Sequence, residues 1–239
     1  MIPIITISSV VMFFFLLLAT IKVYLSYRGT REKKLGYVLK CFISFCIAML
    51  IFLPNGILTK DLLIISFIFN IYVFFYFLGM AYFVALTFEI IHKELIKKIL
   101  FAVIVISGFI FSFVPAIQMQ PATMTVQEPF VFWEDARGPI INTLIGLELA
   151  IFGLWNIVFF LYHGLKSYNE HVRKRSLFFS AGMICFFISA ITDYIFGANP
   201  DIFYVSAYTV FWGFLAVVLF LFALYYKQVK PFGEGENLE

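Results

Sequence analysis

The chain has 239 residues, of which 63% are hydrophobic and only 13% are charged, and its mean hydropathy is +0.99. Because a soluble domain carries about a quarter charged residues, this composition excludes a water-soluble globular protein. It predicts a protein whose solvent is lipid. The formal net charge of +3 gives no reason to expect a nucleic-acid partner, because membrane topology accounts for the basic residues.

Seven apolar segments are each long enough to cross a bilayer, which takes about 20 residues. We predict spans at 4–26, 36–54, 62–91, 96–115, 139–163, 175–197 and 203–226. The fold class is therefore an all-α integral membrane protein, a single seven-helix transmembrane bundle over residues 1–230. The third span is long enough to tilt or to project into water, and Pro115 is expected to interrupt the outer end of the fourth.

The basic residues predict the orientation of the bundle, because cytoplasmic loops are enriched in Lys and Arg. Lys60 and Arg137 are the only basic residues in the loops of one side. The loops of the other side and the tail contain Arg28, Arg31, Lys33, Lys34, Lys93, Lys97, Lys98, Lys166, Arg173, Lys174, Arg175, Lys227 and Lys230. This pattern predicts an N-terminus outside and a C-terminus in the cytoplasm. Residues 231–239 form a small, acidic linker that is either native or derived from cloning.

One connection is long. Residues 116–138 form a segment outside the membrane that is first polar, then aromatic, then acidic. Long loops in compact proteins often serve as lids or binding elements, so Trp133 is a candidate ligand contact. The alternative is an interfacial aromatic belt, with Trp133 at the level of the lipid headgroups.

Polar residues inside membrane spans are costly and are candidates for function. Asn70, Glu148 and Asp193 each lie within about 15 Å of the outer end of their predicted span, so they could line one cavity that opens to the outside. The last span would add an aromatic wall, formed at helical spacing by Tyr204, Tyr208 and Trp212. Structural roles stay open: Asn70 could bond a neighbouring helix, and Asp193 could face water. Glu148, near the membrane centre, must be protonated or paired.

The sequence offers no catalytic, metal-binding or cofactor motif. His92, His163 and His171 have no zinc-ligand spacing, and no nucleophile elbow, phosphate-binding loop or dinucleotide turn is present. The last span has no Lys to hold retinal, as a microbial rhodopsin requires. The motifs typical of G-protein-coupled receptors are also missing. We therefore do not expect an enzyme.

One resemblance covers the last third of the chain. Residues 171–229 read HVRKRSLFFSAGMICFFISAITDYIFGANPDIFYVSAYTVFWGFLAVVLFLFALYYKQV. This resembles the N-terminal seven-helix region of bacterial histidine kinases and related signalling proteins. Shared features are a basic cytoplasmic loop, a sixth helix with Gly and a late acidic residue (here Asp193), a short Pro-containing loop and an aromatic last helix. The outer loop, with Trp133 and Gly138, is compatible, but residues 231–239, which come after Lys230, do not contain the kinase domain expected from the family.

The resemblance implies a sensory module of the bacterial inner (plasma) membrane. Such a module would recognise a small apolar or amphipathic ligand from outside or from the lipid. It would pass the signal through the last helix to a cytoplasmic signalling domain, and family members usually act as dimers. A small-solute or proton-coupled carrier that uses Glu148 remains an alternative, as does a structural or assembly protein.

Overall fold

The fold is taken from a computed structural model, which describes residues 2–54, 58–118, 121–128, 130–134, 138–196 and 202–225. For some residues in these ranges only the backbone is described, namely 2–5, 8, 127, 130, 132–134, 139, 190, 191, 193–196 and 202–206.

The described chain is almost entirely helical, as the sequence predicts. Its helices are α1 (Ile4–Thr30), α2 (Lys33–Phe52), α3 (Leu62–Ile90), α4 (Glu94–Gln118), α5 (Pro139–Lys166), α6 (Glu170–Phe196) and α7 (Ile202–Tyr225). Six of them, all except α6, are long and apolar enough to cross a membrane. The protein is therefore a multi-pass membrane protein by length and composition. Helix α4 runs through Pro115 and ends at Gln118, three residues beyond the predicted interruption.

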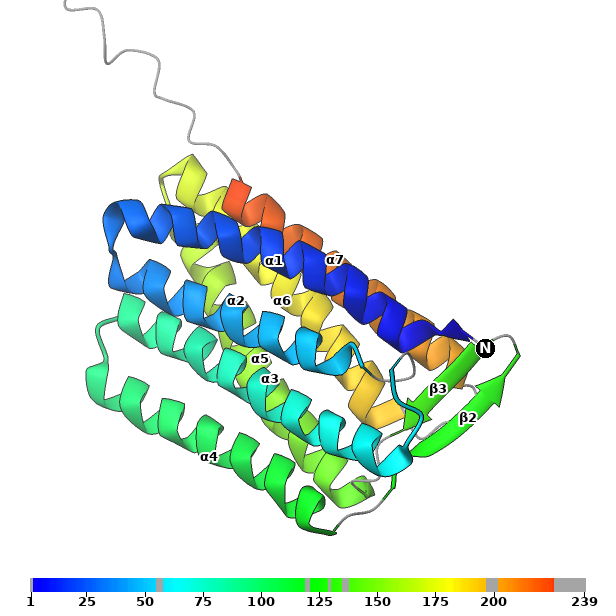
Figure 1. Cartoon of the computed structure of the whole chain (residues 1–239). Coiled ribbons are helices and arrows are strands. Elements are labelled where there is room, and N and C mark those ends of the chain that lie inside the picture. Colours follow the sequence, from blue (N-terminus) through cyan, green and yellow to red (C-terminus); the bar gives the residue numbers. More distant parts are fainter. Residues whose placement is uncertain are drawn as a thin grey trace, which may run out of the picture.

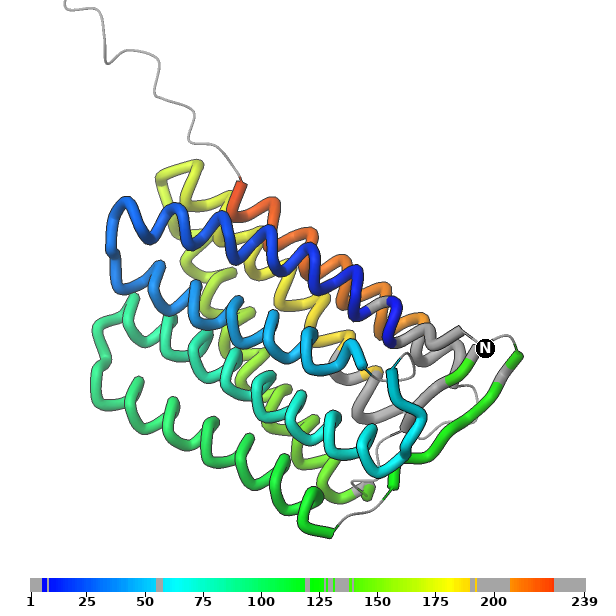
Figure 2. The backbone as a smooth tube through the Cα atoms, in the orientation of Figure 1, coloured from blue at the N-terminus to red at the C-terminus, as the bar shows by residue number. Residues whose placement is uncertain are grey.

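The helices form two layers (Figure 1). Helices α1 to α4 lie in sequence order in one layer, and α5, α6 and α7 lie behind them. Contacts between α1 and α7 and between α3 and α5 join the layers, while α4 packs mainly against α3 at one edge. The tube view shows that the N-terminus and the end of α7 lie at opposite ends of the bundle (Figure 2).

Glycines allow close contact between neighbouring helices. A Cβ atom on Gly108 of α4 would lie 2.4 Å from Cβ of Phe77 on α3, and one on Gly79 of α3 would lie 2.6 Å from the ring of Phe45 on α2. Both are closer than real carbon contacts, so only glycine fits. Small residues that let backbones approach are typical of membrane helices, where van der Waals packing drives association.

Local sequence signals set the helix ends. The side chain of Asp61 accepts hydrogen bonds from the amides of Leu63 (2.9 Å) and Ile64 (3.3 Å) and so caps α3. Asn169 accepts in the same way from the amide of His171 at the start of α6 (3.0 Å). Gly138 precedes Pro139 at the start of α5 with a φ of +54°, a region that favours glycine.

The long outer connection contains a β-hairpin. Strand β2 (Thr123–Gln127) pairs antiparallel with β3 (Phe130–Glu134), and β1 (Ile2–Pro3) pairs parallel with β3. The hairpin packs on α3 through Val131, Ala122 and Ile65, and the Ala122 amide donates to the Leu62 carbonyl at 3.1 Å. The N-terminus and the hairpin therefore lie together, and we name this the hairpin end.

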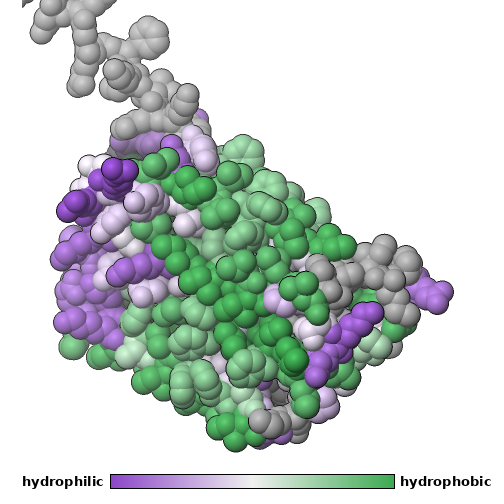
Figure 3. All heavy atoms as spheres, in the orientation of Figure 1, coloured by the Kyte–Doolittle hydropathy of each residue, from purple (hydrophilic) through white to green (hydrophobic). Residues whose placement is uncertain are grey.

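The opposite end of the molecule is basic. The turns after α1, α3 and α5 lie there (Figure 1), and the space-filling view shows a hydrophilic cap on that end beside a largely hydrophobic flank (Figure 3). We name this the basic end. Its described basic residues include Arg28, Arg31, Lys33, Lys34, Lys93, Lys97, Lys98, Lys166, Arg173, Lys174 and Arg175.

Candidate functional site

The predicted outer site falls into two separate groups of described side chains. One group lies on α3, α4 and α5, and the other lies on α7 with its neighbours α1 and α6. Helix α6 lies between α5 and α7 (Figure 1). The side chains of Asp193, Tyr204 and Trp133 lie outside the described residues, so their predicted roles stay predictions.

The first group contains Asn70 of α3 and Glu148 of α5. Asn70 is buried and its Oδ1 atom has no hydrogen-bond partner among the described residues. The Glu148 carboxyl group lies within hydrogen-bonding reach of Ser107 on α4, but its Oε1 atom has no described partner. Asn142, near the start of α5, also has a buried Oδ1 without a described partner. The sequence analysis did not select Asn142.

The second group surrounds Trp212 on α7. The indole Nε1 of Trp212 and the hydroxyl of Thr209 are buried and have no partner among the described residues. The ring of Tyr208 lies 5.9 Å from that of Trp212, but Tyr208 is 55% exposed and does not belong to the buried group. Among the described side chains of α7, Thr209 and Trp212 thus contribute buried polar atoms without a described partner.

These atoms of Asn70, Asn142, Glu148, Thr209 and Trp212 are buried hydrogen-bonding groups without a described partner, a property that binding sites often have. A buried donor or acceptor without a partner costs about 1 to 3 kcal/mol, and native proteins leave few of them unpaired. Each lies within about 15 Å of the hairpin end of its helix. They therefore mark places in that half where an external molecule could supply hydrogen bonds.

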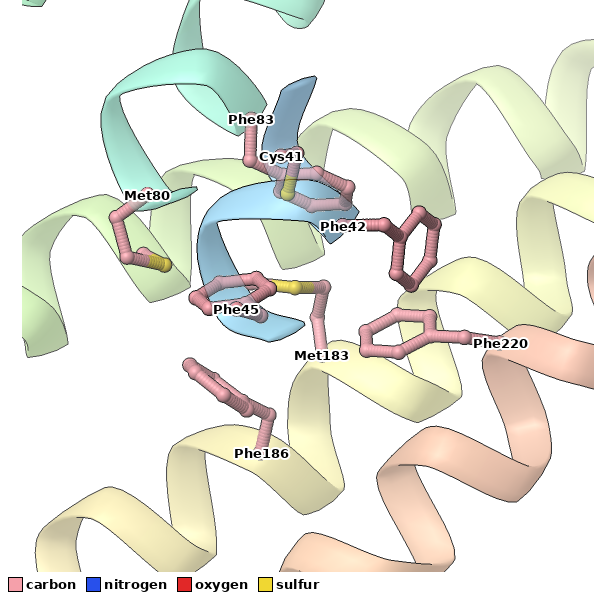
Figure 4. Close-up of a pocket in the computed structure, with 8 residues that line it drawn as sticks. All are labelled: Cys41, Phe42, Phe45, Met80, Phe83, Met183, Phe186 and Phe220. Atoms are coloured by element: carbon pink, nitrogen blue, oxygen red, sulfur yellow. The ribbon is translucent and has the colours of Figure 1, made fainter. Parts of the chain in front are cut away.

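A separate cavity lies deeper in the bundle and has only apolar walls (Figure 4). Its volume is about 10 Å³, close to the minimum for one water molecule. It lies between α2, α3, α6 and α7 and is lined by Cys41, Phe42, Phe45, Met80, Phe83, Met183, Phe186 and Phe220. None of the sequence-predicted site residues lines it, and it is too small for an organic ligand.

Helices α6 and α7 are joined at three levels. Near the hairpin end, the Ser189 hydroxyl donates to the Thr209 carbonyl at 2.8 Å. In the middle, a Cβ atom on Gly182 would lie 2.7 Å from the Phe220 ring. At the basic end, Arg175 donates from Nε to the Ala223 carbonyl (3.0 Å) and from Nη2 to the Leu224 carbonyl (3.2 Å).

The sequence analysis missed a buried ion pair at the basic end. Lys97 of α4 is 7% exposed; it pairs with Glu89 of α3 and, at 2.7 Å, with Glu94. Its Nζ also lies 5.3 Å from the centre of the Tyr37 ring on α2. The sequence analysis uses Lys97 only as a topology signal and does not single out Glu89. A signal for this ion pair is present in the sequence, because Glu89 and Lys97 have opposite charges and lie eight residues apart on either side of the turn between α3 and α4.

Asn156 of α5 is a second residue that the sequence analysis did not select. It is fully buried; its Nδ2 donates to the Phe152 carbonyl at 2.8 Å, and its Oδ1 has no partner among the described residues. Nearby, Trp155 donates from Nε1 to the Thr87 hydroxyl at 2.9 Å and so ties α5 to α3.

Within the described part of the chain, no group of three or more His, Cys, Asp or Glu side chains could hold a metal ion. Cys41, Cys46 and Cys185 are free and buried.

No protein-family model matches the sequence, and no curated protein is significantly similar to it.

Proposed function

We propose that this chain is a membrane-embedded receptor module with seven spans, an outer N-terminus and a cytoplasmic C-terminus. It recognises a small amphipathic ligand in the half of the bundle near the hairpin and transmits a conformational signal through α7 to a cytoplasmic effector. The basic end faces the cytoplasm, as the distribution of Lys and Arg favours. The bacterial inner membrane as location and a histidine kinase-like effector rest on the sequence resemblance.

The observation that carries this proposal is the arrangement of α7. Its outer half holds two buried polar groups without described partners, on Thr209 and Trp212. Its inner end is held by the guanidinium group of Arg175. A ligand that bonds the outer polar groups in only one position of α7 would favour that position. Only such a difference in affinity between two states can shift their populations.

The unpartnered atoms indicate the chemistry of the ligand. A hydroxyl group can accept from the Trp212 indole and donate to the Thr209 oxygen. The surrounding side chains, such as Phe211, whose ring lies 5.5 Å from Trp212, suit an apolar tail. We therefore propose an amphipathic molecule with a polar head of this kind, such as a medium-chain alcohol.

Fluorescence of Trp212 provides a direct test. With Trp133 and Trp155 changed to Phe, Trp212 is the only tryptophan. We expect dodecanol, added to the protein in lipid nanodiscs, to shift the Trp212 emission saturably. Thr209→Val should weaken the saturable shift, whereas Thr143→Val on α5 should leave it unchanged. A shift that rises linearly with dodecanol and ignores Thr209→Val would reflect bilayer perturbation alone and would refute the proposal.

A carrier is the second candidate, and the contact between Glu148 and Ser107 favours it. These groups come from α5 and α4, and an ionisable side chain within a membrane span is a candidate for proton coupling. Flux assays in liposomes distinguish the two functions. The receptor predicts no solute or proton flux driven by a pH gradient. A flux that Glu148→Gln abolishes would instead support the carrier.

Dimerisation is proposed from the resemblance. Within span five, Gly146, Ala150 and Gly153 have the spacing of a close helix contact. A Cβ atom on Gly153 would lie 3.2 Å from Phe187 of α6, so this position serves packing within the chain. A dimer interface would therefore use another surface.

A further inference from the structure

We propose that the seam where α1 packs against α7, at the basic end, binds an anionic phospholipid whose phosphate contacts Lys22 and Tyr225. This site differs from the proposed ligand site in the other half of the bundle. It stands whether or not α7 transmits a signal.

The polar part of the seam is formed by two side chains from different helices. The Nζ atom of Lys22 on α1 lies 5.1 Å from the centre of the Tyr225 ring at the end of α7. Lys22 is partly exposed and Tyr225 is 51% exposed. Among the described residues, no carboxylate lies within ion-pair distance of Lys22. The ammonium group and the phenol hydroxyl are thus available together to one anion.

Lys97 is another lysine at this end that lies over a tyrosine ring of a neighbouring helix, but its surroundings differ from those of Lys22. Lys97 also lies over a tyrosine ring, that of Tyr37, but Glu89 and Glu94 neutralise its charge. Lys97 needs no external anion because its carboxylates are supplied by the chain. Lys22 has the ring without the carboxylates.

The position of Lys22 suits a lipid headgroup. It lies eight residues before the end of α1 at Thr30, or about 12 Å along the helix, where a long side chain can reach the membrane interface. Surrounding basic residues attract anionic lipid and so raise its local concentration near the surface. A phosphodiester is therefore the anion that this depth and charge favour.

An apolar stripe continues from Lys22 toward the hairpin end. Leu18, Phe14 and Val11 follow at helical spacing and are exposed to 51%, 57% and 42%. These residues could lie along an acyl chain whose phosphate contacts Lys22. A charged group at one end of an apolar stripe matches a phospholipid, which has both a phosphate and an acyl chain. A free phosphate ion would contact only Lys22 and Tyr225 and would leave the stripe unused.

Native mass spectrometry of the full chain tests this site, with equimolar palmitoyl-oleoyl phosphatidylglycerol and phosphatidylcholine in mild detergent. We expect the first bound lipid to be phosphatidylglycerol. Lys22→Gln should weaken this adduct about fivefold. Lys34→Gln removes the same charge at an exposed position of the same end and should change it little. Lys22→Arg should retain it.

Tyr225→Phe keeps the ring and removes only the hydroxyl, so it tests the site even if Lys22→Gln does not fold. We expect it to weaken the adduct about twofold or more, in line with the loss of one hydrogen bond. Inorganic phosphate should not compete at millimolar concentration; competition would show that the site binds the anion and not the lipid. Equal losses in Lys22→Gln and Lys34→Gln, or equal retention of both lipids, would overturn the proposal.

Discussion

Arg175 at the start of α6 donates a hydrogen bond from Nε to the carbonyl of Ala223 in the last turn of α7, at 3.0 Å. A second bond from Nη2 reaches the Leu224 carbonyl at 3.2 Å. The last carbonyls of a helix have no partner within it and carry partial negative charge, so a guanidinium group is well suited to them. This contact makes the exit of α7 depend on the position of α6.

We predict that Arg175→Gln loosens the end of α7 without unfolding the bundle. Hydrogen exchange should become faster in the last turn of α7, and stability should fall by about 1 kcal/mol, because charged hydrogen bonds at a partly exposed site contribute modestly. Hydrogen–deuterium exchange in nanodiscs measures this. Arg173→Gln, a charge-matched change at an exposed neighbour, is the control. Equal protection of α7 in both variants would show that the contact has no role.

We predict that Lys97→Gln is strongly destabilising. The change leaves Glu89, whose side chain is only 12% exposed, without its cation, and breaking a buried ion pair typically costs about 3 to 5 kcal/mol. Lys98→Gln, at an exposed position beside it, should have little effect. Thermal unfolding followed by tryptophan fluorescence compares the two. Similar melting temperatures would mean that water reaches Glu89.

We predict that Gly108→Ala separates α4 from α3. The new Cβ atom would meet Cβ of Phe77 at 2.4 Å, and such overpacking costs about 1 to 3 kcal/mol. Gly29→Ala is the matched control, because a Cβ atom there would have no neighbour within 4 Å. The melting temperature should fall for the first variant and stay constant or rise for the second. A neutral Gly108→Ala would contradict the tight packing of these helices.

The seven helices could be predicted from the sequence because long apolar segments are a strong local signal. The hairpin could not, since strands β2 and β3 are short and depend on pairing with each other and on packing against α3 through Val131. The helical course of α4 through Pro115 was also missed. A membrane helix tolerates proline because the surrounding groups can satisfy the freed carbonyl.

The candidate site could be predicted only in part. Polar residues in apolar spans are visible in a sequence, and Asn70 and Trp212 are indeed buried or partly buried with unpartnered atoms among the described residues. Their distribution over two groups follows from the order in which the helices pack, which composition does not encode. The Lys97–Glu89 ion pair was missed for another reason. A Lys near a helix end already has an explanation as a topology signal, so the sequence gives no cause to look for its partner.

We predict that the hairpin end faces outward. Leu58 lies between α2 and α3 and is 81% exposed, and Tyr168 lies between α5 and α6 and is fully exposed. Each is changed to Cys in a separate variant. With the three native cysteines replaced, a membrane-impermeant maleimide should label Leu58→Cys in intact cells and Tyr168→Cys only after permeabilisation. The reverse pattern would invert the proposed topology, and labelling of both in intact cells would refute alternating spans.

The central claim, that a ligand moves the exit of α7, is tested most directly by pulsed electron paramagnetic resonance. Spin labels on Leu95 of α4 and Phe222 of α7, both well exposed, report the position of the α7 end. Labels on Leu95 and Leu165 serve as a reference pair outside α7. We expect dodecanol to change the distance distribution of the first pair and to leave that of the second unchanged. Unchanged distances in both pairs, under conditions where the Trp212 signal is saturated, would contradict the account.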